Sequence, residues 1–367
     1  MKTHQKLMQQ RGVTLIELMV TIAITLFLIT AAAYVYLNTR ETQRAIERNS
    51  SNTETGEFAL QLIGREIMKA GFYPATVTRL SATEIRPKLT SYPPVKLAQN
   101  AATATDWTSP ANVYLSGLFG CDGAKFQPST ATCPIDASTS TKPAPDSIVI
   151  NYFTNDNMGS AKVGDSYDCT GASIGSYSSG GTYTGDASNK NRVNAANSLT
   201  PPLQPLLVSN RFGLNTTNAS VDQQAITTLS LACNGNGGAQ SNTYQPLVAG
   251  IEDMQFTYGV FASTADTTRL TPDNFYTATQ VNALNSVTVD TGTGPILLSP
   301  WSRVVAVRVC IMTKSMGASP KIGDASGSQR TYVDCNDATV TPATTDTSLR
   351  KRFVQVFAVR NRMNQSF

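Results

Sequence analysis

The sequence predicts an α+β protein, in which a long amino-terminal α-helix packs on an antiparallel β-sheet domain with long, disulfide-stapled loops. Three observations lead to this fold class. An apolar run near the amino terminus continues into helix-compatible sequence. Short runs of alternating apolar and polar residues follow, separated by polar spacers. Six cysteines lie in that second part of the chain.

These observations divide the chain into four segments. We expect a leader at residues 1–12, a membrane-spanning and assembly half of the helix at 13–37, an amphipathic half at 38–73, and a periplasmic or extracellular β-rich domain at 74–367.

The amino-acid composition argues against nucleic-acid binding and against the classes of enzyme that need a histidine. Charged residues make up 15% of the 367 residues, and three of the 29 basic residues (Lys2, Lys6 and Arg11) lie in the leader. Without the leader, 26 basic residues face 25 acidic ones, and such a nearly neutral chain argues against specific nucleic-acid binding. The single histidine, His4, also lies in the leader, so Ser-His-Asp, Cys-His and most catalytic zinc sites cannot form after its removal. We therefore expect no enzyme, no cofactor and no metal.

The run from Val13 to Leu37 contains one charged residue, Glu17. About 20 apolar residues span the hydrocarbon core of a bilayer as a helix. The basic residues before the run predict that the amino terminus stays in the cytoplasm while the bulk of the chain crosses the inner membrane. An ordinary signal peptide, cut near Ala31–Ala33, is the alternative. Glu17 and the helix-compatible sequence after Ala33 argue against it.

The second half of the helix is expected to be amphipathic. No proline occurs before Pro74, and the charged residues between positions 41 and 47 have i,i+3 spacing. Gly71 followed by Pro74 is a helix stop signal. We therefore expect one helix of about 60 residues, about 90 Å long. Residues 49–56 have low helix propensity, which leaves open the alternative of a bend or break there. One apolar stripe should face the domain: Leu60, Ile63, Ile67 and Ala70.

The remainder of the chain is predicted to form an antiparallel sheet with one face on the helix. Five runs are strand candidates: Asp146–Phe153, Ile226–Ala232, Gly250–Val260, Arg303–Met312 and Arg352–Val359. Five spacers rich in Ser, Thr, Gly, Asn and Asp are predicted to be loops, for contact with partners or simply variable: 170–200, 213–225, 234–243, 262–295 and 316–350.

The even number of cysteines predicts disulfides formed in an oxidising compartment. No Cys-x-x-Cys pair occurs. Sequential pairing closes the shortest loops, so we expect Cys121–Cys133 and Cys310–Cys335, and Cys169–Cys233 by elimination. Buried free thiols are the alternative.

The stretch GVTLIELMV, residues 12–20, resembles the processing site of type IV prepilins and type II secretion pseudopilins. The likeness consists of a short basic leader that ends in glycine and an apolar segment with glutamate at its fifth residue. It implies that a prepilin peptidase cuts between Gly12 and Val13 and that the new amino terminus of Val13 is methylated. Most relatives have phenylalanine where this chain has Val13. Major pilins often carry glycine and proline near the places of Leu26 and Tyr34.

The resemblance also implies a role for Glu17 in assembly. Cleavage would free an ammonium group on Val13, about 6 Å along the helix from Glu17. In a helical stack, Glu17 could pair with the Val13 ammonium of a neighbouring subunit and set the register of assembly. The alternative is a carboxylate that is protonated or reaches the interface. Family members at the extreme filament tip lack this glutamate, which argues against that position.

A second resemblance covers four blocks that begin at Pro145, Leu247, Trp301 and Leu349. In this order they look like the blocks of PilW-type minor pilins. The likeness implies a pilin fold and a structural subunit that helps initiate type IV pilus assembly and is incorporated at or near the tip. Its implied partners are other minor pilins, the major pilin, the prepilin peptidase and a large tip adhesin. A minor pseudopilin of a type II secretion system is the alternative.

Other motifs give weaker signals. Residues 155–165 and 233–238 offer oxygen ligands but lack the spacing of an EF-hand. Residues 290–295 are glycine-rich but precede no helical pattern, so they do not predict a phosphate loop. The basic run at 349–362 is interpreted as the flanks of an edge strand rather than a DNA-binding segment. A carbohydrate-active enzyme using Glu252 and Asp253 is disfavoured, because neighbours on a strand point to opposite faces.

Overall fold

The computed structural model describes fifteen segments of the chain. They are residues 14–72, 76–77, 89–90, 117–127, 133–134, 144–153, 167–172, 207–221, 224–235, 243–261, 271–290, 295–316, 331–343, 346 and 348–363.

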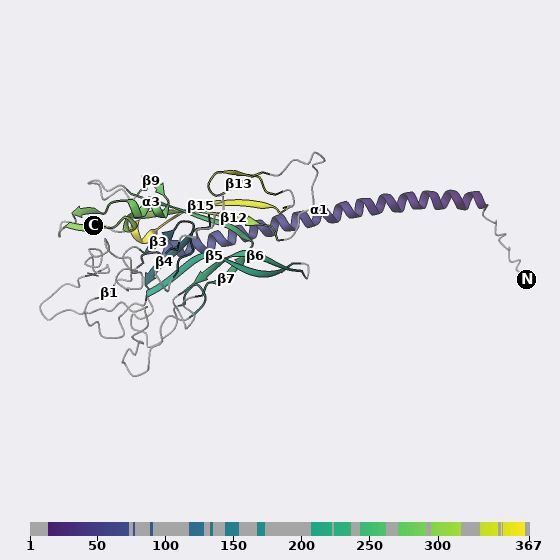
Figure 1. The fold of residues 1–367 in the computed structure, drawn as a ribbon. Coiled ribbons are helices and arrows are strands. Elements are labelled where there is room, and N and C mark those ends of the chain that lie inside the picture. The colour runs from purple at the N-terminus through teal and green to yellow at the C-terminus, as the bar shows by residue number, and fades with distance from the viewer. Residues whose placement is uncertain are drawn as a thin grey trace, which may run out of the picture.

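One long helix, α1 (Leu15–Lys69), runs along the domain and projects beyond it (Figure 1). Its 55 residues correspond to about 80 Å. The expected single long helix is therefore confirmed. A break at residues 49–56, which the sequence left open, does not occur, because α1 continues through this stretch.

The strands form two main antiparallel sheets, where the sequence predicted a single one. The first has the order β3-β4-β5-β6-β7: Leu118–Cys121, Ser147–Phe153, Leu207–Val221, Gln224–Asn234 and Gln245–Ala249. The second has the order β15-β12-β8-β9: Arg350–Ala358, Val304–Lys314, Ile251–Val260 and Asn274–Tyr276.

Smaller elements complete the described part of the chain. Three pairs of short antiparallel strands are β1 with β2 (Thr76–Val77, Leu89–Thr90), β10 with β11 (Val287–Asp290, Pro295–Leu298) and β13 with β14 (Tyr332–Val333, Thr339–Val340). Short helical segments are α3 (Ala278–Ala283), the 3₁₀ turn η2 (Pro300–Arg303) and α4 (Arg360–Met363).

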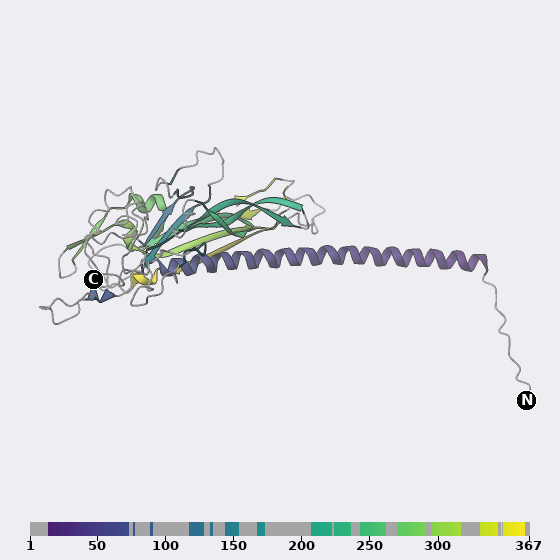
Figure 2. The same cartoon turned by 90° about the horizontal axis from the view of Figure 1, so that it is seen from below.

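The second half of α1 lies along both sheets. It contacts β15 and β12 of the second sheet and β4 and β7 of the first. Seen after a 90° turn, the helix forms one side of the domain and the sheets lie together on its other side (Figure 2). The predicted stripe is confirmed as its core face: Leu60, Ile63, Ile67 and Ala70 are buried in the main apolar cluster.

The chain crosses from the first sheet to the second at Gly250, between β7 and β8. Its amide donates to the carbonyl of Leu229 at 3.0 Å, and its carbonyl accepts from the amide of Lys314 at 2.9 Å. The backbone has φ 87° at this position. Glycine adopts this conformation without the strain that a side chain would introduce.

Asp146 joins the two sheets by its carboxylate. Its oxygens accept hydrogen bonds from the amide of Gly123 at 2.7 Å and from the amide of Phe256 at 2.9 Å. Burial raises the pKa of Asp146 to about 7, although these two hydrogen bonds act in the opposite direction. The nearby carboxylates of Asp122 and Asp253 contribute to the rise.

Several predicted loops contain regular structure. The prediction of a loop at 213–225 is wrong, because most of this stretch belongs to the hairpin of β5 and β6. The two strands pair in continuous register from Arg211–Asn234 to Val221–Gln224. The spacer at 262–295 contains β9, α3 and β10, and that at 316–350 contains β13 and β14. Residues 173–200 and 236–242 lie outside the described residues. All five predicted strand regions are confirmed as strands.

Candidate assembly site on the amino-terminal helix

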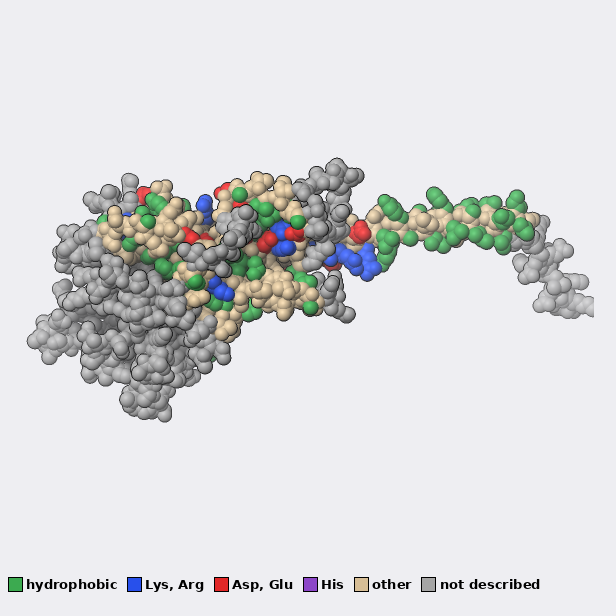
Figure 3. Space-filling view, viewed as in Figure 1, with side chains coloured by type: hydrophobic (Ala, Val, Ile, Leu, Met, Phe, Trp, Pro, Cys, Tyr) green, Lys and Arg blue, Asp and Glu red, His purple; other side chains and the backbone are tan. Residues whose placement is uncertain are grey.

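The first half of α1 touches no other part of the described chain. All side chains from Leu15 to Leu37 are exposed, and most of them are apolar (Figure 3). By length and composition, α1 is the one helix among the described residues that could cross a membrane. These 23 residues correspond to about 35 Å of helix, enough for a hydrocarbon core of about 30 Å.

The threonine hydroxyls within this apolar half donate to carbonyls of the preceding turn. Thr21 donates to the carbonyl of Leu18 at 2.9 Å, Thr25 to that of Thr21 at 2.7 Å, and Thr30 to that of Leu26 at 2.8 Å. Water is absent from the bilayer core, so a hydroxyl without a partner there would be costly. The threonines are therefore compatible with an apolar environment on every side.

Thr14 caps the helix directly before Glu17. Its backbone is extended, and its hydroxyl oxygen accepts from the amide of Glu17 at 3.3 Å. Glu17 is thus the third residue of the helix, where the exposed amides of the first turn favour a negative charge. The sequence reasoning did not identify Thr14, although Thr-x-x-Glu before an apolar run is a known helix-start pattern.

The structure places only part of the predicted processing site. Glu17 lies in the first turn of α1, whereas Gly12 and Val13 lie outside the described residues. The cut after Gly12, the methylation of Val13 and the pairing of Glu17 therefore remain predictions.

Two glycines of α1 seat aromatic rings from β15. Gly56 faces Phe353 and Gly64 faces Phe357, so close that a Cβ atom on either glycine would overlap the ring. Phe353 and Phe357 lie four residues apart on β15 and therefore share one face of the strand. Gly56 belongs to the stretch where the sequence left a break open, and this contact explains why glycine occurs inside a continuous helix.

Polar contacts fix α1 along the same strand. The side-chain amide of Asn52 donates to the carbonyl of Leu349 at 3.3 Å, and Lys351 donates to the hydroxyl of Thr53 at 2.9 Å. At the end of α1, the side-chain amide of Asn361 donates to the carbonyl of Lys69 at 3.1 Å. This carbonyl is one of those that the last turn of a helix leaves without a partner in the helix. The carboxyl-terminal segment thereby stabilises both the face and the end of the helix.

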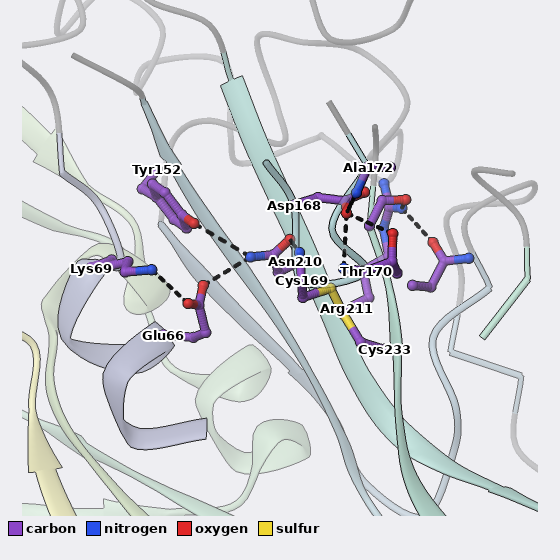
Figure 4. Close-up of a disulfide and its surroundings, with 12 residues drawn as sticks. Glu66, Lys69, Tyr152, Asp168, Cys169, Thr170, Ala172, Asn210, Arg211 and Cys233 are labelled. Atoms are coloured by element: carbon purple, nitrogen blue, oxygen red, sulfur yellow. Dashed lines mark hydrogen bonds and ion pairs between the residues drawn. A yellow bond between two sulfur atoms is a disulfide. The ribbon is translucent and has the colours of Figure 1, made fainter. Parts of the chain in front are cut away.

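Glu66 connects α1 to the first sheet (Figure 4). One oxygen accepts from Lys69 at 2.6 Å, and the other accepts from the side-chain amide of Asn210 on β5 at 2.8 Å. The oxygen of Asn210 in turn accepts from the amide of Cys169 at 3.0 Å. Burial raises the pKa of Tyr152 beside them, and the negative charge of Glu66 adds to this rise.

Three disulfides staple the domain in the order expected from the sequence: Cys121–Cys133, Cys169–Cys233 and Cys310–Cys335. Cys169–Cys233 attaches the segment at 167–172 to β6, next to Asn210. The network that holds Glu66 is therefore covalently anchored at its far end.

The other candidate sites do not gain support. Glu252 forms an ion pair with Arg350, and Arg350 also contacts Asp346 at 2.5 Å. Burial alone would raise the pKa of Asp346, but the hydrogen bonds from Arg350 hold it below its usual value. The carboxylate of Asp253 accepts from the amide of Met254 at 2.8 Å, so both predicted acids make structural contacts.

The candidate ligand loops at 155–165 and 233–238 are described only in part. In the part of the chain that the structure describes, no group of three or more His, Cys, Asp or Glu side chains is arranged to hold a metal ion. Residues 155–165 lie outside that part. Asn234, in the other candidate loop, accepts from Arg211 at 2.7 Å. Of the glycine-rich run at 290–295, the structure describes Asp290 and Pro295, which pair at the ends of β10 and β11; residues 291–294 lie outside the described residues.

Two family models match this chain, one at the amino-terminal helix and one in the sheet domain. Residues 7–33 match the model of the prokaryotic N-terminal methylation motif. Residues 216–361 match the model of the type IV pilus-assembly protein W family. A type IV-like pilin from Thermus thermophilus aligns over 72% of this chain and 92% of its own, with 10% identity and a TM-score of 0.23. A search among curated proteins gave no match.

The methylation motif on a long apolar helix, followed by the antiparallel domain, defines a type IV pilin-like protein. Such proteins are structural subunits that are processed by a prepilin peptidase and contact other pilins. Within this class, residues 216–361 match the PilW type of minor pilin.

Proposed function

We propose that this minor pilin helps to initiate type IV pilus assembly and is incorporated at or near the pilus tip, without catalytic activity. Its leader, residues 1–12, is removed after Gly12, and the new amino terminus of Val13 is methylated. Before assembly, the chain is a single-pass inner-membrane protein with its amino terminus in the cytoplasm. Afterwards it is part of the filament at the cell surface.

The exposed apolar half of α1 carries this proposal. A helix that is apolar all round needs lipid or other helices around it, and residues 15–37 contact nothing else in the described chain. Glu17 is the one acid in this half. In the filament it pairs with the ammonium of a neighbouring Val13, because a carboxylate among apolar helices is tolerated only when it is paired.

The continuity of α1 favours retention of the whole helix. Ala31–Ala33, where a signal peptidase could cut, lies in the middle of the helix. The residues that follow hold α1 to β15 through Gly56 and Gly64. The domain is thereby joined to the assembly half by one uninterrupted element.

The proposed partners are other minor pilins, the major pilin and a large tip adhesin. Glu17 argues against the extreme tip, because a subunit with nothing above it has no neighbouring ammonium to pair with. We therefore place this subunit one step or more below the end of the filament.

The mature amino terminus tests the processing step. Mass spectrometry of the filament-associated form should give N-methylated Val13. An intact leader would refute the pilin mechanism, and an amino terminus at Tyr34 would show ordinary secretion. Scoring surface filaments against secreted enzymes in a deletion strain separates a pilus role from a type II secretion role.

A further inference from the structure

Strand β15 (Arg350–Ala358) has an edge to which no other described strand is hydrogen-bonded. It is the end strand of its sheet, and its pairing with β12 runs without interruption from Lys314–Arg350 to Ala306–Ala358. An unpaired edge presents backbone N–H and C=O groups that can pair with another chain.

The composition of this edge makes it receptive to another strand. Residues 353–359 contain no charge, no glycine and no proline. Val354 and Val356 share one face and are 47% and 51% exposed. Native edges are usually blunted by a bulge, a proline or charged side chains, especially lysine, and the basic residues here flank the segment at 353–359 without interrupting it. Here the irregularities in register lie between β12 and β8, and β15 has none against β12.

The charges at the two ends of the segment indicate what kind of strand fits. Lys351 and Arg360 are both exposed and flank the uncharged residues. If two copies of β15 paired antiparallel with these segments aligned, the basic end of each would meet the basic end of the other. Parallel pairing would place identical cations side by side. Like charges at opposed positions are destabilising, so a second copy is a poor partner and an acidic-ended strand is a good one.

We infer that the β15 edge binds an extended segment of a different protein, which has alternating apolar residues and an acidic residue at each end. The segment adds a strand to the four-stranded sheet, with its apolar side chains beside Val354 and Val356. On the opposite face of the same strand, Phe353 and Phe357 pack into Gly56 and Gly64 of α1. A partner bound at this edge therefore sits on the strand that holds the assembly helix.

Designed peptides test this inference with the full chain in detergent micelles. The probe is a fluorescent peptide of sequence Asp-Thr-Val-Thr-Val-Thr-Val-Asp, and its control has Lys at both ends. By fluorescence anisotropy, the acidic peptide should bind at least about tenfold more tightly than the basic one. Its binding should slow hydrogen exchange at residues 351–358 and leave residues 245–249, in the edge strand β7, unchanged.

Substitutions on the two edges provide the matched control. The double variant Val354→Lys/Val356→Lys should lose at least about tenfold in affinity for the acidic peptide, although the added positive charge alone would attract it. Leu247→Lys, on β7, should leave the affinity unchanged; Leu247 is also a partly exposed apolar residue on an edge strand, at 36%.

Three results would overturn the inference: equal affinity for the two peptides, protection outside β15, or unchanged binding to the double variant. Hydrogen exchange on the wild-type chain decides the question even if the double variant does not fold. The inference does not depend on processing after Gly12, so the peptide experiment can fail while cleavage and assembly proceed.

Discussion

Substitution of Gly64 by alanine tests how tightly α1 is held against β15. A methyl group at this position would lie 2.7 Å from Cδ1 of Phe357, and closer still to Cε1 and Cζ. Ordinary carbon contacts are about 3.5–4.0 Å, so the ring would have to move by about 1 Å or more. Phe357 is only 8% exposed, so it has little room to move.

The expected cost follows from two opposing terms. Overpacking of a buried site costs about 1–3 kcal/mol, and alanine gains about 1 kcal/mol over glycine in a helix interior. We expect Gly64→Ala to lower the free energy of unfolding by up to about 2 kcal/mol and the melting temperature by up to about 4 °C. Thermal unfolding of the full chain in detergent micelles, followed by circular dichroism, measures this change.

Two controls identify the ring as the cause. Gly56→Ala should cost less, under about 1 kcal/mol, because Phe353 is only partly buried and can swing outward. In the Gly64→Ala background, Phe357→Leu should lower the free energy of unfolding less than it does in the wild type, by at least about 1 kcal/mol, because the smaller side chain leaves space for the methyl group. Additive effects in this cycle, or a Gly64→Ala protein more stable than wild type, would refute the packing argument.

Three further predictions concern single polar groups. Glu17→Ala should still insert into the membrane and be cleaved but assemble poorly, measured as the yield of sheared filaments against membrane-bound protein; normal piliation would contradict the salt-bridge account. Because the pKa of Asp146 is raised from 3.8 to about 7 in the folded state, its protonation stabilises the fold at low pH. That contribution should be lost as the pH rises through about 7, and it amounts to at most about 4 kcal/mol. Asp146→Asn should therefore flatten the dependence of unfolding free energy on pH between 5 and 8, and parallel curves would count against the prediction. Asn210→Ala should cost about 1–3 kcal/mol in chemical denaturation, because it removes a hydrogen bond to the largely buried Glu66; the exposed-hairpin variant Thr216→Ala serves as the control.

The local sequence was sufficient to predict features that depend on the spacing of residues within one helix. The apolar run to Leu37, the lone Glu17, and the stripe at Leu60, Ile63 and Ile67 were identified from periodicity and charge alone. Each depends on spacing along one helix, and the described helix has these features as predicted.

The local sequence was not sufficient where distant residues decide the conformation. Low helix propensity left a break open at 49–56, but contacts of Asn52 with Leu349 and of Gly56 with Phe353 hold this stretch against the domain. Packing of this kind commonly overrides propensity.

The part of the β5–β6 hairpin at 213–225 was mistaken for a loop, because Asn, Thr and Ser fill positions 215–218 and 220. These side chains are polar on both faces, so the hairpin shows no alternation of apolar and polar residues. Threonine is nevertheless a good strand former, and strand pairing from Arg211–Asn234 to Val221–Gln224 stabilises the hairpin.

By itself, the sequence determined which half of the helix is apolar on all sides and where the one acid of that half lies, because both follow from the order of residues along the chain. Only the tertiary structure decided that the sheet is divided in two at Gly250, that Asn210 holds Glu66, and that the β15 edge is left unpaired by every described strand. Those features depend on residues that are far apart in the chain and meet only once it has folded.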